Sequence, residues 1–421
     1  MMRQQLMDNV YLTYIHSEKF KTSFLSAQMA APLEKETAGR NALLVNVLSR
    51  GTVRCPDISA IGRELDMLFG ARLEPTIRKV GENQLLGFVA SGIDDRFLPK
   101  GEKLLEKLTD LLGEFYCYPV TRGGRLLEEY VESERKNLAE MIRSDVNDKR
   151  SYAARRLLET MCGGERYGIG RMGSAPDVEK ISLQNLNAYY RDVLPKGRLE
   201  LFYCGSAPEK RVSGAFTRAL AALPRHGFSL EPTATLRKAA REPVQVVEEE
   251  MDVSQGKLCM GYRTESADMP ATMLMNAMFG GATTSKLFVN VRERLSLCYY
   301  ADSVFHRMKG LITVSSGIEF ANYGKAVDEI TRQLEALQNG SWEDWELEGA
   351  RQSLLNSLRS VDDSAGAIED FLMGQAAAGL DETIPGLIAA IQGVTPQRIR
   401  EAAQAVKPDT IYFLKGKEEL Q

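Results

Sequence analysis

The stretch Gly280–Tyr300, which reads GGATTSKLFVNVRERLSLCYY, decides how the rest of the chain is interpreted. The apolar run Met273–Phe279 before it predicts a buried helix. We expect the two glycines to end that helix, because glycine adopts backbone angles that other residues resist. Thr284 or Ser285 can then cap a second helix, in which leucine, phenylalanine and valine recur at three- and four-residue spacing. The stretch therefore predicts two consecutive helices separated by glycines.

The end of this stretch changes from helical spacing to alternation. Arg292 falls in the last turn of the second predicted helix, where the negative end of the helix favours a cation. The strand that follows is expected to carry these side chains on one face: Tyr299, Ala301, Ser303 and Phe305. Arg292 and Tyr299 should then be close enough to act together. From the residues alone, a solvated arginine and a packed strand tyrosine remain the simpler interpretation.

The same stretch resembles the second-domain signature of the insulinase/pitrilysin superfamily of zinc peptidases, roughly S-x-LF-x-x-x-RE-x-x-x-L-x-Y after a pair of glycines. The matching residues are Gly280, Gly281, Ser285, Leu287, Phe288, Arg292, Glu293, Leu297 and Tyr299. In that family the arginine and the tyrosine at these positions reach across to the zinc site, where they hold substrate and stabilise the tetrahedral intermediate. The resemblance therefore implies a joint functional role for Arg292 and Tyr299.

Length and composition are those of a globular protein with two domains. The chain has 421 residues, of which 44% are hydrophobic and 26% charged, and its net charge is −4. Lys and Arg are spread along the chain without the basic stripe of a nucleic-acid-binding protein, so that class is set aside. No apolar run approaches the roughly 20 residues of a membrane span, and the N-terminus lacks the apolar core of a signal peptide.

The cysteines indicate a reducing compartment. They are scattered, they never form a C-x-x-C pair, and most have apolar or aromatic neighbours: Cys55, Cys117, Cys162, Cys204, Cys259 and Cys298. This pattern is typical of buried, reduced thiols rather than of a disulfide framework. We therefore expect a cytoplasmic location.

The second half of the chain repeats the order of elements of the first half. Ser182–Tyr203 predicts a capped helix, a turn and a strand, and Thr395–Leu414 predicts the same three elements. The predicted helix pair within Arg125–Met161 is likewise echoed within Glu343–Ala378. Two copies of one α+β unit explain the length of the chain.

We therefore predict an α+β fold of two tandem homologous domains, each an antiparallel-rich mixed sheet backed by helices, as in insulinase-like proteins. The first domain is expected at residues 1–223 and the second at 244–421. Residues 224–243 between them are rich in Pro, Arg and Ser/Thr, show no sustained period, and are interpreted as a linker.

The zinc motif of the catalytic relatives is missing. Those members carry H-x-x-E-H on the first helix of the first domain, because positions i, i+3 and i+4 share one helix face; two imidazoles bind Zn²⁺ and the Glu activates the metal-bound water. Alignment on Gly51-Thr52 places Ala42, Val45 and Asn46 at the three positions. The first two cannot bind metal, and one Asn cannot replace both a ligand and the base.

No other arrangement of ligands is evident. The downstream glutamate ligand of the family falls near Glu140, and the better register puts Met141 in its place. The three histidines, His16, His226 and His306, show no ligand spacing. We therefore expect no metal or other cofactor in this chain, and no peptidase activity by this chain alone.

A chain without the zinc motif that retains the Arg–Tyr pair resembles one subunit of the two-subunit members of the superfamily. The resemblance implies a zinc-bearing paralogue with H-x-x-E-H as partner, a shared chamber for peptides, and zinc in the partner only. The alternative is a non-catalytic structural or peptide-binding scaffold, for which a homodimer is one possible assembly. A third hypothesis is a maturation subunit dedicated to one small modified peptide.

Overall fold

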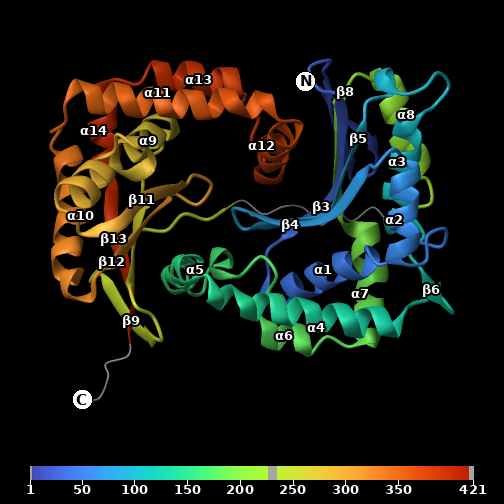
Figure 1. Cartoon of the computed structure of the whole chain (residues 1–421), viewed down its shortest axis with the longest axis horizontal. Helices are drawn as coiled ribbons and strands as arrows, with labels where there is room; N and C mark the ends of the chain where they lie inside the picture. The colour runs from blue at the N-terminus through green and yellow to red at the C-terminus, as the bar shows by residue number, and fades with distance from the viewer. Residues whose placement is uncertain (1, 226–234, 417–421) are drawn as a thin grey trace. The chain divides into compact units, whose positions relative to one another are not determined.

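The computed structural model describes residues 2–225 and 235–416 (Figure 1). These residues form two compact units. Unit 1 contains the described residues of Met1–Arg143, Ile169–Ala234 and Asp362–Asp381. Unit 2 contains those of Ser144–Gly168, Thr235–Val361 and Glu382–Gln421. Of the predicted linker 224–243, residues 226–234 lie outside the described residues.

Unit 1 is built on a six-stranded sheet with the order β1-β2-β8-β3-β5-β4. The strands are β1 (Met2–Met7), β2 (Val10–His16), β3 (Thr22–Pro32), β4 (Arg72–Val80), β5 (Asn83–Ile93) and β8 (Arg198–Gly205). β2 and β8 are parallel, and the other neighbours are antiparallel. A separate two-stranded ribbon joins β6 (Thr121–Arg122) and β7 (Arg125–Leu126).

Unit 2 is built on a five-stranded sheet with the order β11-β12-β10-β13-β9. The strands are β9 (Gln245–Met251), β10 (Gly256–Thr264), β11 (Cys298–His306), β12 (Leu311–Ile318) and β13 (Val406–Gly416). β9 and β13 are parallel, and the other neighbours are antiparallel. From β9 to β11, this sheet therefore repeats the order β2-β8-β3-β5-β4 with the same parallel and antiparallel pairings. Strand β1 is the one strand of the first sheet without a counterpart.

The helices follow the same repeat. The helices of the first half of the chain are α1 (Lys35–Leu48), α2 (Ile58–Met67), α3 (Leu104–Cys117), α4 (Glu128–Ser144), α5 (Lys149–Met161), α6 (Ala175–Glu179), α7 (Leu183–Lys196) and α8 (Glu209–Ala219). Those of the second half are α9 (Met269–Asn276), α10 (Tyr323–Gln338), α11 (Asp344–Ser360), α12 (Ala365–Ala378), α13 (Ile384–Gln392) and α14 (Pro396–Gln404), with the π-helical segments η4 (Ala277–Gly281) and η5 (Leu287–Arg294). No helix in the described ranges is long and apolar enough to cross a membrane.

Each half of the chain contributes one helix to the unit that is built mainly from the other half. The predicted division of the chain into two consecutive domains did not include this exchange. Helix α12 of the second half belongs to unit 1, where Met373 packs with Phe202 of β8. Helix α5 of the first half belongs to unit 2, where Leu157 packs with Cys259 and Tyr412. Each sheet thus has one face covered by a helix from the other half of the chain.

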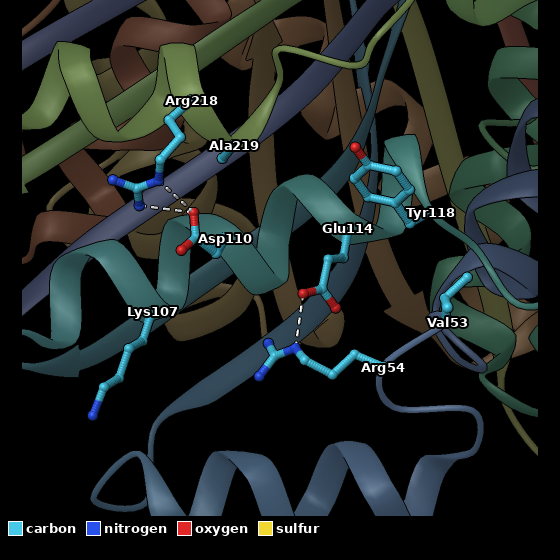
Figure 2. Close-up of a pocket in the computed structure, with 8 residues that line it drawn as sticks. All are labelled: Val53, Arg54, Lys107, Asp110, Glu114, Tyr118, Arg218 and Ala219. Carbon is cyan, nitrogen blue, oxygen red and sulfur yellow. Dashed lines mark hydrogen bonds and ion pairs between the residues drawn. The ribbon is translucent and has the colours of Figure 1, made fainter.

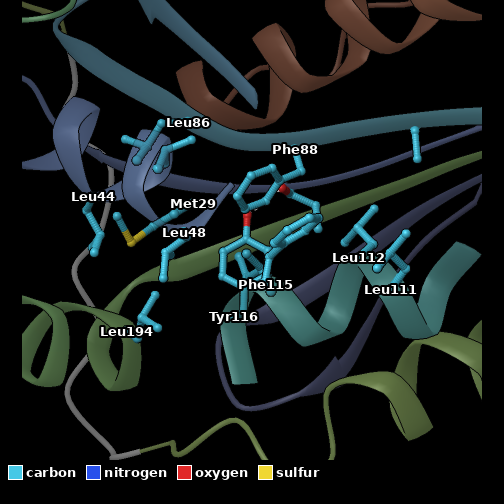
Figure 3. Packing of buried hydrophobic residues seen from close by; sticks show 14 of the residues in the cluster. Met29, Leu44, Leu48, Leu86, Phe88, Leu111, Leu112, Phe115, Tyr116 and Leu194 are labelled. Carbon is cyan, nitrogen blue, oxygen red and sulfur yellow. Dashed lines mark hydrogen bonds between the residues drawn. The ribbon is translucent and has the colours of Figure 1, made fainter. Parts of the chain in front are cut away.

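The main core of unit 1 lies between its sheet and the helices α1, α3 and α7. In Figure 3, Met29, Leu44, Leu48 and Leu86 lie to one side of the aromatic rings of Phe88, Phe115 and Tyr116. There Phe88 of β5 stacks on Phe115 of α3, with ring centroids 4.7 Å apart. Unit 2 has its own core of the same kind, between its sheet and α9, α10 and α14.

The predicted fold class is confirmed, and so are the mirrored caps. The Ser182 hydroxyl accepts a hydrogen bond from the backbone amide of Asn185 at 3.2 Å and caps the start of α7. The Thr395 hydroxyl accepts the amide of Arg398 at 3.4 Å and begins α14. Capping of this kind depends on residues a few positions apart, which is why the sequence predicts it well.

Candidate functional site

The two helices predicted in Met273–Arg294 are present, but both contain π-helical turns. Helix α9 continues into η4, and η5 follows after a short break. The wide turns show in the bond from the Leu295 amide to the Asn290 carbonyl, at 3.2 Å, which spans five residues. The Ser285 hydroxyl accepts the amide of Phe288 in the first turn of η5, at 3.4 Å. π-Helical turns are rare and are frequent at functional sites.

Gly280 is required for a different reason from the predicted one. Neither Gly280 nor Gly281 has the positive φ that would demand glycine. A Cβ on Gly280 would instead lie 2.6 Å from the backbone nitrogen of Ser303 on β11. The Ser303 hydroxyl also donates to the Asn276 side chain at 2.8 Å. The glycine thus permits close packing of η4 on β11, and the helix ends for reasons other than glycine's backbone freedom.

Arg292 lies in the last turns of η5, as predicted, and its side chain is 40% exposed. Its guanidinium lies 4.6 Å from the ring centroid of Phe288, one turn earlier. Its other charged contact is a loose one, 3.6 Å to the carboxylate of Glu293. Both contacts come from its own segment, so the guanidinium retains donors that are free to bind another group.

Tyr299 lies at the start of β11, as predicted, but the prediction that it shares a face with Ala301, Ser303 and Phe305 is wrong. Tyr299 is 75% exposed, whereas Ala301 and Ser303 are buried. The cause is a β-bulge: Cys298 pairs with Ile318 and Ala301 pairs with Ser316, so two residues oppose one. The bulge turns the Tyr299 ring toward solvent. Within the described chain its hydroxyl makes no hydrogen bond.

The segment between Arg292 and Tyr299 has a further irregularity. Ser296 adopts a left-handed conformation, with φ of +48°, which non-glycine residues rarely adopt. Arg292 and Tyr299 make no direct hydrogen bond with each other, and the two exposed side chains flank this turn. Their joint action therefore remains a prediction.

The positions of the missing zinc motif belong to the core of unit 1. Ala42 is 0% exposed, Val45 is 3% exposed, and both belong to its main hydrophobic cluster. Asn46 is half-buried in the last turn of α1. Met141, at the position of the downstream glutamate, is half-exposed on α4. Two of these four side chains carry no polar atom, so the residues do not fit a zinc ion, and we derive no step through one.

Other candidate ligands are also engaged elsewhere. His306 uses both ring nitrogens, at 3.0 Å from the Tyr167 hydroxyl and 3.0 Å from the Thr313 hydroxyl. His16 lies 3.5 Å from the Tyr14 hydroxyl, and His226 falls outside the described residues. In the part of the chain that the structure describes, no group of three or more His, Cys, Asp or Glu could hold a metal ion.

An open pocket lies in unit 1, and none of the predicted site residues lines it. Figure 2 shows its wall, formed by α3, α8 and the loop after α1, around about 580 Å³. Its charged side chains are all paired: Arg54 with Glu114 at 2.8 Å, Arg218 with Asp110 at 2.8 Å, and Lys107 with Glu102 at 2.9 Å. Because the pairing leaves little excess charge to select a ligand, we assign this pocket no role in the site.

Comparison with known proteins identifies the family. The family model described as Peptidase M16 inactive domain matches residues 180–354, which include Arg292 and Tyr299. A Bacillus subtilis (strain 168) protein named probable inactive metalloprotease YmfF is 35% identical over 408 residues, which cover 96% of this chain and 95% of that protein. The chain belongs to the insulinase/pitrilysin-type (M16) peptidase family. It is an inactive, zinc-less paralogue in that family, as the sequence resemblance predicted.

Solved structures show the same fold over the whole M16-type chain. A conserved protein from Enterococcus faecalis V583 is similar with a TM-score of 0.90 at 27% identity, covering 100% of this chain and 99% of that one. A peptidase M16 inactive domain from Pseudomonas fluorescens is similar with a TM-score of 0.80 at 15% identity, with the same coverage. The latter likeness concerns the fold alone.

Proposed function

We propose that this chain is the non-zinc subunit of a heterodimeric insulinase-like peptidase. In this proposal its partner is a paralogue that carries H-x-x-E-H and the zinc ion, and the two subunits enclose a chamber for peptides. The observation that carries the proposal is the exposure of Arg292 and Tyr299: Arg292 contacts only Phe288 and Glu293 of its own segment, and the Tyr299 hydroxyl makes no hydrogen bond within the described residues. Side chains kept only for packing would be buried or hydrogen-bonded.

The chemistry of the two side chains fits such a role. A guanidinium offers paired N–H donors that match a carboxylate or two backbone carbonyls, so Arg292 would hold the substrate chain. A phenol donates one O–H, so Tyr299 would donate a hydrogen bond to the oxyanion that develops during peptide hydrolysis. The metal and the general base would come from the partner, because the residues at 42, 45 and 46 do not supply them.

The cysteines support the cytoplasmic location that belongs to this proposal. None of the six forms a disulfide in the described residues, and burial raises the pKa of Cys204 to about 11. Buried, protonated thiols are stable in a reducing compartment.

The first test is the composition of the native complex. We would purify the untagged complex from its source cell and measure mass, zinc content and subunits together. A one-to-one partner of similar size with H-x-x-E-H and bound zinc would support the divided peptidase. A zinc-free homodimer without such a partner would contradict it and favour the scaffold alternative.

The second test removes the two side chains from the assembled enzyme. Arg292→Ala and Tyr299→Phe should each lower kcat/KM for peptide hydrolysis by about 10²-fold, the usual loss when one transition-state donor is removed. Arg294→Ala is the matched control, because Arg294 lies on the same segment and donates to Asn290 instead. Unchanged hydrolysis in both Arg292→Ala and Tyr299→Phe would refute the proposed role.

A further inference from the structure

The bulge that exposes Tyr299 is built around its neighbour, Tyr300. In the pairing of β11 with β12, Tyr299 and Tyr300 together oppose Gly317. A Cβ on Gly317 would lie 2.5 Å from Cε1 of the Tyr300 ring, so this ring packs directly on the glycine. The Tyr300 ring is therefore held against the sheet where Tyr299 is turned away from it.

One residue of α5 holds the Tyr300 ring from another side. The Arg150 guanidinium lies 4.1 Å from the centroid of that ring, a close cation–π contact. Its Nη2 also donates to the Asp302 carboxylate at 2.5 Å. Burial raises the pKa of Asp302, and the positive charge of Arg150 opposes that rise. Arg150 therefore contacts both Tyr300 and Asp302, two residues of β11 that project from the same side of the strand.

Arg150 is itself fixed by the cap of its helix. The Asp148 carboxylate accepts the amides of Arg150 and Ser151, both at 3.1 Å, and the Ser151 hydroxyl at 2.7 Å. Hydrogen bonds from Ser151 and Arg150 lower the pKa of Asp148. Further along α5, Ala153 and Leu157 are fully buried with residues of β10 and β13. The first turn of α5 therefore has a defined place on the sheet of unit 2.

We propose that Arg150 is a positioning residue for Tyr299: it clamps Tyr300 and Asp302 onto the sheet and so maintains the bulge that presents the Tyr299 hydroxyl. This inference rests on the proposed function for its consequence in hydrolysis, but its structural part stands on unit 2 alone. It also gives the exchanged helix α5 a role, because a residue from the first half of the chain shapes the site in the second half.

The structural part is tested by hydrogen–deuterium exchange on the full chain. Arg150→Ala should speed amide exchange in residues 298–302 about three- to tenfold, since a half-exposed cation–π contact and an ion pair are lost together. Gly317→Ala should do the same by displacing the Tyr300 ring. Arg155→Ala is the control, because Arg155 lies on the same helix and pairs with Glu159. Unchanged exchange in both Arg150→Ala and Gly317→Ala would overturn the inference, whatever Tyr299 does in catalysis.

The functional part is tested by measuring hydrolysis in single and double variants of Arg150, Tyr299 and Arg292 in the assembled enzyme. Arg150→Ala should lower kcat about three- to tenfold with little change in KM, and Arg150→Lys, which keeps the charge facing Asp302, should recover part of the loss. On a Tyr299→Phe background Arg150→Ala should add nothing, whereas on an Arg292→Ala background it should retain its full effect. An equal loss on both backgrounds would overturn a role through Tyr299. If Tyr299→Phe and Arg292→Ala both leave hydrolysis unchanged, the proposed function fails, and hydrogen exchange still decides whether Arg150 maintains the bulge.

Discussion

The two halves of the chain present the same elements in the same order, yet they differ in regularity where the family places its chemistry. In unit 1, α1 and α2 are ordinary α-helices, and β4 pairs with β5 without a shift in register. In unit 2, the equivalent elements are α9 with η4, then η5, then β11, which contains a bulge. In the first half, the zinc-motif positions Ala42 and Val45 lie in a regular, buried helix. In the second half, Arg292 and Tyr299 are exposed on irregular elements.

Not every irregularity separates the two halves. A left-handed residue precedes the edge strand in both: Phe69, with φ of +59°, before β4, and Ser296, with φ of +48°, before β11. This turn therefore belongs to the repeat. The π-helical turns and the bulge in β11 have no counterpart in α1, α2 and β4 of unit 1. Local strain that a repeat does not require is a stronger sign of function than strain that both copies share.

The largest difference in stability should appear when histidine is introduced both in the core of unit 1 and at the exposed position of unit 2. Ala42→His introduces a large polar ring at a fully buried position in the core of unit 1, so we expect a loss of about 3 kcal/mol or more in unfolding free energy. Tyr299→His replaces an exposed side chain and should change the unfolding free energy by less than about 0.5 kcal/mol. Scanning calorimetry of the two variants measures both values.

The same experiment extends to the whole motif. The triple variant Ala42→His, Val45→Glu, Asn46→His should be unstable and should not bind zinc, because two of its three new side chains enter packed core. A stable triple variant with one bound zinc per chain would show that this face of α1 is still a site rather than core.

The π-helical turns provide a second, smaller test. Gly280→Ala places a Cβ against the backbone of β11 and should cost about 1–3 kcal/mol, because a strand cannot move aside cheaply. Gly281→Ala is the matched control, since its Cβ would lie 3.2 Å from both Nδ2 and the backbone oxygen of Asn276, a tight contact but not the 2.6 Å clash expected at Gly280. Calorimetry should show a clearly larger loss for Gly280→Ala. Equal losses would indicate that the glycines act through backbone freedom, as the sequence first indicated.

Much of this fold was predictable because it depends on local spacing. The caps at Ser182 and Thr395, the repeat of elements and the place of Arg292 in the last turns of η5 all follow from residues a few positions apart. The exchange of α5 and α12 was not predictable, because an amphipathic helix does not specify which sheet it covers. Likewise, nothing local requires π-helical turns around Gly280.

The orientation of Tyr299 shows the limit more clearly. The sequence contains one usable signal: consecutive strand residues point to opposite faces, so Tyr299 and Tyr300 cannot both pack on the same face of the sheet. Which ring packs on the sheet is decided by Gly317 and Arg150, both distant in sequence. The position of the site was therefore predictable from its motif, whereas its geometry depends on tertiary contacts.

The shared turn gives the smallest expected effect. Ser296→Gly removes the penalty of about 1 kcal/mol that a non-glycine residue pays in the left-handed region, but glycine loses a similar amount through its freedom in the unfolded chain. Unfolding free energy should therefore stay within about 0.5 kcal/mol of the parent chain, and hydrolysis by the assembled enzyme within about twofold. Ser296→Val, which forces a β-branched residue into this region, should be the less stable of the pair. A loss of activity in Ser296→Gly as large as that in Tyr299→Phe would instead place the turn within the site.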